Sequence, residues 1–277
     1  PKSLERANMT ICIAGICERG ERIVCVSDMK ISTTAFSSDY MMQKFYQVHR
    51  NWWAMLAGTV TDCNSVLREV TEALHGNKSE VTFRKARDTF RRAYQNQLKM
   101  CREDQVLSLY GMTIKEFKKD GRRKLGEKIF DGLNRKLEDV ELDASFIVFG
   151  FAKGKGHVFS IDGSLCIKDH TAPGFAAIGT GSYAAKSMMF FQGFSTLTSL
   201  HYAIYKMCAS KFMAETASDI GESTIAVIIE PKGKATRVDF HLIDEMRKAW
   251  KEQMQVSPNS QITDRIAESL RAGAVQS

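Results

Sequence analysis

Residues 10–32 read TICIAGICERGERIVCVSDMKIS, and this stretch decides the fold. It holds two short runs of apolar and β-branched residues, at 10–17 and 23–27, separated by a polar turn that contains Gly20. Two such runs around a short polar turn predict a β-hairpin. The chain is therefore expected to begin its folded part with paired strands.

Beyond the hairpin, strand and helix patterns alternate in blocks. Apolar residues recur at helical spacing over 62–74 and again from about residue 79 onward. The other predicted helices are 183–192, 197–213, 243–253 and a segment around 262–270, and the other predicted strands are 45–48, 52–57, 145–152, 157–162, 164–168, 175–178, 224–230 and 236–242. This order predicts an α+β domain in which two antiparallel sheets pack face to face and helices cover both outer sides, a four-layer αββα sandwich.

Three parts are expected along the chain: an N-terminal extension or propeptide at 1–9, one domain at 10–242, and a helical tail at 243–277. Inside the domain, residues 102–142 keep a helical periodicity that several glycines interrupt. We expect this insertion to form short helices on an exposed rim.

Composition narrows the function classes. The 277 residues contain no apolar run long enough to cross a bilayer, and residues 1–9 contain no apolar core of a signal peptide. Seven cysteines without CxxC spacing argue against a disulfide framework and a structural zinc site, and the six histidines show no ligand spacing. A cytoplasmic protein without a cofactor is expected, with no membrane partner.

The net charge of +7 is the one hint of nucleic-acid binding. Much of the excess lies where Lys and Arg alternate with Asp and Glu at helical spacing, which is typical of a solvated helix face. We therefore expect no nucleic-acid partner.

Five short motifs carry the functional signal. They are Thr10–Gly15 (TICIAG), Ser27–Ser32 (SDMKIS), Lys44–Phe45 (KF), Leu56–Asp62 (LAGTVTD) and Ile178–Ala184 (IGTGSYA). With these motifs in this order, the chain resembles the proteasome β-subunit and HslV-like family of N-terminal-nucleophile hydrolases. The resemblance spans about residues 10–230 and implies the four-layer fold predicted above.

The resemblance implies a catalytic role for four residues. Thr10 would be the nucleophile, and its own α-amino group, with a pKa near ~8, would be the base. Lys44 would supply a cation beside both groups, and Asp28 would pair with Lys44 and hold its ammonium in place. The backbone N–H of Gly58 would face the developing oxyanion.

The second half of the chain would supply supporting groups. The family places a hydroxyl near the threonine amine, where Thr180 stands, and Asp219 would be the nearby carboxylate with Ser223 as its accompanying hydroxyl. Family members also bind a monovalent cation through backbone carbonyls, and Ser218, Gly221 and Thr224 have a similar spacing. No other metal and no cofactor is implied.

Nine residues precede Thr10, and an amide nitrogen cannot serve as the base. Three readings remain open: translation from Met9 with removal of that Met, self-cleavage of residues 1–9, or a retained extension and an inactive protein. The leading expectation is a threonine hydrolase that cleaves peptide or amide bonds after autoprocessing at Thr10. The alternatives are an inactive proteasome-like assembly or scaffold subunit, and an amidase that acts on a small metabolite.

The same resemblance implies a homo-oligomer, in a ring or a helical stack, that takes a peptide or protein substrate and works with an ATP-dependent unfoldase. Phe190, Phe191 and Phe194, together with the tail, are expected to contribute apolar interface area.

Overall fold

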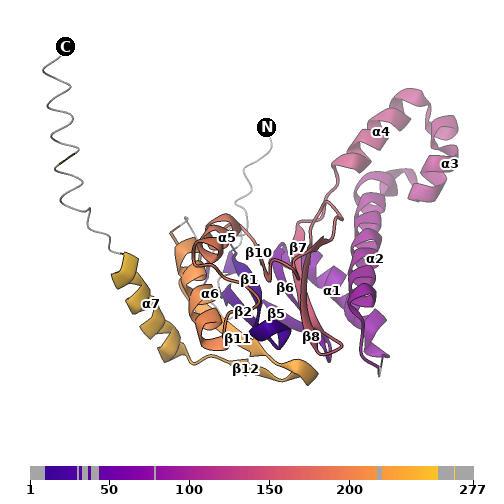
Figure 1. The fold of residues 1–277 in the computed structure, drawn as a ribbon. Helices are drawn as coiled ribbons and strands as arrows, with labels where there is room; N and C mark the ends of the chain where they lie inside the picture. The colour runs from indigo at the N-terminus through magenta and orange to yellow at the C-terminus, as the bar shows by residue number, and fades with distance from the viewer. Residues whose placement is uncertain are drawn as a thin grey trace, which may run out of the picture.

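A computed structural model describes residues 10–29, 31–32, 37–38, 44–77, 79–216, 220–254 and 265. Within these residues, two five-stranded antiparallel sheets stack face to face and helices cover their outer sides, so the predicted α+β sandwich is confirmed (Figure 1). The first sheet has the order β10-β1-β2-β11-β12, with β1 at Cys12–Cys17, β2 at Arg22–Asp28, β10 at Phe175–Ile178, β11 at Thr224–Ile229 and β12 at Ala235–Arg237.

The second sheet follows the chain order β5-β6-β7-β8-β9. Its strands are β5 at Phe45–His49, β6 at Trp52–Gly58, β7 at Ala144–Ala152, β8 at Lys155–Ile161 and β9 at Lys168–Asp169. A separate pair is formed by β3 at Ile31–Ser32 and β4 at Ser37–Ser38.

The predicted hairpin is β1 paired with β2, and it lies at the centre of the first sheet. Successive side chains of a strand point to opposite faces. Cys12, Ala14 and Ile16 accordingly face the second sheet, whereas Ile13 and Cys17 face the helices. Both faces are buried, which explains why this strand is apolar at every position.

The outer helices lie on opposite sides of the sandwich. The second sheet is covered by α1 at Val60–His75 and α2 at Phe83–Arg102, and the first sheet by α5 at Ser182–Phe191, α6 at Leu200–Ala214 and α7 at Phe240–Met254 (Figure 1). Each helix layer shares an apolar cluster with the sheet beneath it, and a third cluster lies between the sheets.

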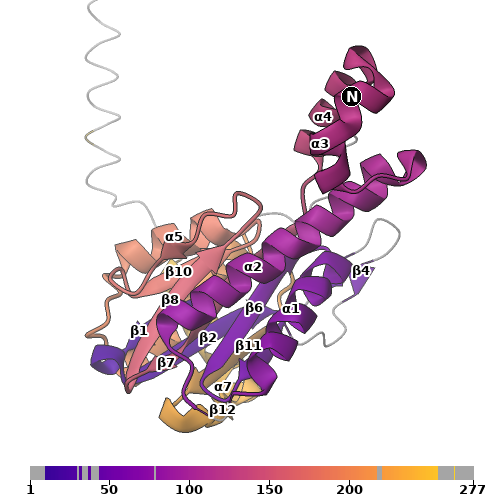
Figure 2. The ribbon, with the colours of Figure 1, turned by 90° about the vertical axis from the view of Figure 1, so that its right-hand side faces the viewer.

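The helical stretch after α2 lies outside the sandwich. After a π-helical and a 3-10 turn, Glu103–Leu107 and Ser108–Tyr110, it contains α3 at Ile114–Leu125 and α4 at Glu127–Asp139, which project beyond the end of α2 (Figure 2). Thr113 and Glu116 form a capping box at the start of α3. Phe117 stacks on Phe130 with ring centroids 4.6 Å apart, so this arm has a small apolar core of its own.

Two predicted strands are wrong. Residues 164–168 contain only the start of β9, because the Asp162 carboxylate accepts from the backbone N–H and hydroxyl of Ser164 and turns the chain, with Leu165 at φ +58°. Residues 236–242 reach only Arg237 as a strand, since Asp239 accepts from the N–H of His241 at 2.8 Å and starts α7. The predicted helix at 262–270 lies outside the described residues, apart from residue 265.

Surface exposure separates the three phenylalanines expected at an interface. Phe190 is 68% exposed and Phe191 83% exposed, on α5. Phe194 is buried and makes an edge contact with Phe175, so it belongs to the core. Among the described residues, no helix has the length and apolar character required to traverse a bilayer.

Candidate functional site

Thr10, Asp28 and Lys44 meet at one point between the two sheets. The Lys44 ammonium donates to the Thr10 hydroxyl at 2.8 Å and to both carboxylate oxygens of Asp28, each at 2.8 Å. All three are buried, with Thr10 6%, Lys44 5% and Asp28 0% exposed. A buried cation thus lies against a hydroxyl and is neutralised by a carboxylate that it binds through two bonds.

The hairpin register brings Thr10 and Asp28 together. Cys12 pairs with Ser27, so the residues just before β1 lie opposite the end of β2. The Ile11 N–H donates to the Asp28 carboxylate at 2.9 Å, and the Asp28 N–H donates to the Ile11 carbonyl at 3.2 Å. Lys44 arrives from the other sheet, immediately before β5, so the site joins the two layers.

Gly58 ends β6, and the packing around it requires a glycine at this position. Its φ is +118°, and a Cβ there would lie 2.2 Å from the Asp143 carbonyl oxygen. Thr59 fastens the same turn to Asp143 through its N–H at 2.7 Å and its hydroxyl at 2.8 Å. The Cys12 thiol reaches the Leu56 carbonyl at 3.3 Å, which places β6 beside the start of β1. The oxyanion role of the Gly58 N–H stays a prediction.

The turn after β10 packs directly on Thr10. Gly179 has φ +91°, and a Cβ there would lie 2.0 Å from the Thr10 carbonyl oxygen. Thr180 follows in this turn and is exposed. The Ile178–Ala184 motif thus contacts Thr10 through the backbone of Gly179. The role of the Thr180 hydroxyl remains a prediction.

The remaining predicted residues belong to the segment before β11. Asp219 and Ser218 lie outside the described residues. Ser223 is half-buried and lines a cavity of about 560 Å³ together with Met29, Thr224 and Arg247. Two of these lining residues are neighbours of Asp28: Met29 follows it in the chain, and Thr224 is its partner in the sheet.

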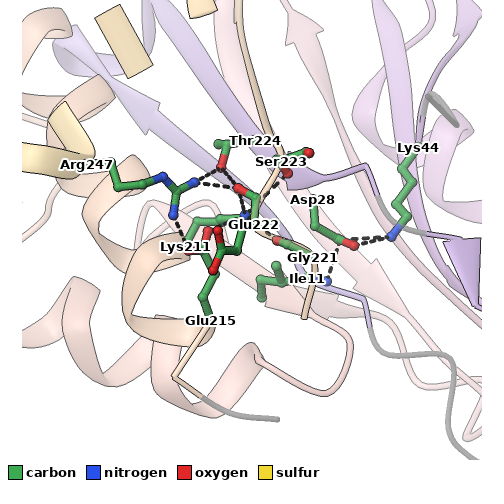
Figure 3. A network of polar contacts seen from close by, with 10 residues as sticks. All are labelled: Ile11, Asp28, Lys44, Lys211, Glu215, Gly221, Glu222, Ser223, Thr224 and Arg247. Atoms are coloured by element: carbon green, nitrogen blue, oxygen red, sulfur yellow. Dashed lines mark hydrogen bonds and ion pairs between the residues drawn. The ribbon is translucent and has the colours of Figure 1, made fainter. Parts of the chain in front are cut away.

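A second buried lysine, which sequence reasoning missed, holds this segment (Figure 3). Lys211 on α6 is 0% exposed, and its ammonium donates to the carbonyls of Gly221 at 2.6 Å, Glu222 at 2.9 Å and Ser223 at 3.3 Å. It also forms an ion pair with Glu215. Burial lowers the pKa of Lys211 to about 8, and the Glu215 carboxylate opposes that shift.

Arg247 on α7 completes this cluster. It pairs with Glu215, donates to the Glu222 carbonyl and to the Thr224 hydroxyl, and lies over the Phe212 ring at 4.3 Å. The sequence carried a signal for Lys211: it occupies the apolar face of a helix, four residues after Met207 and four before Glu215.

This lysine lies against part of the expected monovalent-cation site. Gly221 was expected to offer its carbonyl to a monovalent metal ion, together with Ser218 and Thr224. That carbonyl accepts from the Lys211 ammonium at 2.6 Å, and a second cation close to that ammonium would be repelled by its charge. Ser218 lies outside the described residues, so the cation site stays a prediction.

No family model matches the chain, and a search of the curated proteins finds no match. In the part of the chain that the structure describes, no three His, Cys, Asp or Glu side chains lie together in a way that suits a metal ion. The chemical capacity of the site rests on the geometry of Thr10, Asp28 and Lys44.

Proposed function

We propose that the protein is a threonine hydrolase that cleaves peptide or amide bonds through Thr10 after residues 1–9 are lost. One observation carries this proposal: the buried Lys44 ammonium lies 2.8 Å from the Thr10 hydroxyl oxygen while Asp28 binds it through both carboxylate oxygens. A hydroxyl is a weak nucleophile, and a fixed cation at hydrogen-bond distance stabilises the negative charge that develops on its oxygen.

The proposed reaction has two steps. Thr10 Oγ1 attacks the substrate carbonyl carbon, its proton passes to the free α-amino group of Thr10, and the C–N bond breaks as the amine leaves with that proton. The resulting ester on Thr10 is hydrolysed by water, which restores the hydroxyl. A free amine on Thr10 requires that the bond between Met9 and Thr10 has been broken.

Intact mass and active-site labelling test the proposal. The purified protein is expected to begin at Thr10 and to react with an epoxyketone or β-lactone probe at that residue. Thr10→Ala should abolish labelling, whereas Thr10→Ser should retain it because the hydroxyl remains. A protein that begins at Thr10 and takes up neither probe would contradict the hydrolase.

Two other outcomes separate the alternatives. Mature, assembled protein that keeps the Met9–Thr10 bond would favour a non-enzymatic assembly subunit. Turnover of small amides without turnover of fluorogenic peptides would favour a metabolite amidase. The expected homo-oligomer, unfoldase partner and cytoplasmic location belong to the same proposal, and the exposed Phe190 and Phe191 on α5 support a subunit contact.

A further inference from the structure

The segment 220–224 contacts the candidate site through two of its residues. Ile220 is buried, and a side chain added at Gly181 would lie 2.3 Å from its Cδ1 atom, so it packs against the turn that follows Gly179. Thr224 is the sheet partner of Asp28. The path of this segment therefore sets the position of that turn and of the end of β2.

Three consecutive carbonyls of this segment point at one atom. Those of Gly221, Glu222 and Ser223 all accept from the Lys211 ammonium, as Figure 3 shows. In an extended strand successive carbonyls point in opposite directions, so this convergence needs a bent backbone and a positive charge to hold it. A ring of carbonyl oxygens around a monovalent cation is the arrangement by which proteins replace the hydration shell of such an ion.

The charges around Lys211 come from two helices. Glu215, next to the end of α6, forms ion pairs with both Lys211 and Arg247. Arg247 on α7 also donates hydrogen bonds to the Glu222 carbonyl and to the Thr224 hydroxyl. An ammonium has three N–H donors and no acceptor, so a fully buried lysine must find several oxygens. Here most of those oxygens belong to the segment itself.

We propose that the Lys211 ammonium is a built-in monovalent cation that fixes the 220–224 segment, and that Lys211 is thereby a positioning residue for the Thr10–Asp28–Lys44 site. The first half stands on the geometry alone, and the second half rests on the proposed function. The chemistry predicts that a free ammonium or alkali ion substitutes for Lys211 when the side chain is removed.

Thermal unfolding of Lys211→Ala tests the first half. This variant leaves the Gly221 and Ser223 carbonyls without the Lys211 ammonium and leaves room for a small ion, while Arg247 keeps its contact with the Glu222 carbonyl. Its Tm is expected to rise, by on the order of 5 °C, when choline chloride is replaced by ammonium or potassium chloride at equal ionic strength. The wild-type protein and Lys206→Ala, a matched lysine variant on the same helix, should show no such difference. An equal response of all three proteins would overturn the proposal.

Lys211→Met provides an independent measurement, because it keeps the side-chain stem and removes only the charge. Amide hydrogen exchange at residues 220–224 is expected to be at least about tenfold faster than in the wild-type protein, with unchanged exchange in β6 and β7. Unchanged exchange at 220–224 would overturn the built-in cation even if Lys211→Ala did not fold.

Labelling of Thr10 tests the second half. The rate of probe uptake by Lys211→Ala is expected to be about tenfold below wild type in choline chloride and to recover in ammonium chloride, whereas the wild-type rate should be equal in both salts. If the wild-type protein takes up the probe and Lys211→Ala takes it up at the same rate in choline chloride, the positioning role is wrong. If the wild-type protein takes up no probe, the hydrolase is wrong, and Tm and hydrogen exchange still decide the built-in cation.

Discussion

Lys44 and Lys211 are two buried lysines that differ in what they bind. Lys44 donates to one carboxylate and to a hydroxyl, at 2.8 Å in each case. Lys211 donates to one carboxylate and to three backbone carbonyls. Both are nearly or fully excluded from solvent, with 5% and 0% exposure.

The acceptors decide the role of each lysine. A backbone carbonyl does no acid–base or nucleophilic chemistry here, so an ammonium that binds three of them holds a conformation. A hydroxyl can attack a carbonyl carbon, so an ammonium against it can change reactivity. Burial of a lysine is therefore a weak indicator of catalysis until its partners are known.

The largest expected effect comes from Lys44→Met. Loss of the ammonium should slow labelling of Thr10 about 10²- to 10³-fold, the usual cost of removing one preorganised electrostatic contact to a reacting oxygen. The measurement is the second-order rate of probe uptake, with intact mass used to verify processing. A loss no greater than the tenfold expected for Lys211→Ala would remove the distinction between the two lysines.

Stability should respond to the same substitution, because Lys44→Met removes the ammonium that both oxygens of the buried Asp28 carboxylate bind. We expect a loss of about 3–5 kcal/mol in the free energy of unfolding. Asp28→Asn combined with Lys44→Met removes both charges and should recover a large part of that loss, as measured by urea denaturation. Equal stability of Lys44→Met and the double variant would contradict this prediction, because it would show that the Asp28 charge costs nothing once the Lys44 ammonium is removed.

The sequence predicts the sandwich and the first lysine for identifiable reasons. The hairpin follows from two apolar β-branched runs around a polar turn, and its register brings Asp28 beside Thr10. Lys44 was expected from a motif resemblance, and the structure places its ammonium between those two residues. These positions depend on residue types that are visible in the sequence.

Lys211 was missed because its partners are backbone carbonyls, which have no signature in the sequence. Every residue carries a carbonyl, so the convergence of the carbonyls of Gly221, Glu222 and Ser223 depends on backbone path and not on residue type. The strand predicted at 164–168 failed for a related reason: one carboxylate, that of Asp162, bends a stretch whose apolar residues would suit a strand.

A smaller effect is expected at the turn that supports Thr10. Gly179→Ala forces a Cβ to 2.0 Å from the Thr10 carbonyl oxygen at a φ of +91°. It should destabilise the protein by about 2–3 kcal/mol and slow probe labelling, because the Thr10 backbone must shift. Urea denaturation measures the loss of stability, and the rate of probe uptake measures the slower labelling.

Gly132→Ala is the matched control for that variant. Gly132 lies in α4 with no atom within 4 Å of an added Cβ, so the change should stabilise the protein by up to about 1 kcal/mol. Similar effects of both substitutions would show that the Gly179 turn is not pressed against Thr10.

The smallest effect concerns the cysteine beside each lysine. Cys12 lies near Lys44 and Cys208 near Lys211, and each lysine lowers the thiol pKa. Burial outweighs both lysines: it raises the pKa of Cys208 to about 12 and that of Cys12 further above its usual range. At pH 8 the Cys208 thiol is therefore expected to stay protonated, and the thiolate is the form that reacts.

Maleimide labelling at pH 8, read by peptide mass, is therefore expected to modify the exposed Cys166 first, with Cys12 and Cys208 unmodified in the native protein. Raising the pH to 9 should leave that order unchanged, because burial limits access as well as ionisation. Lys211→Met removes the cation that favours the Cys208 thiolate, so ionisation alone would make that thiol less reactive. Faster labelling of Cys208 in this variant would instead mean that α6 opens from the sheet, and that Lys211 holds the helix as well as the segment before β11.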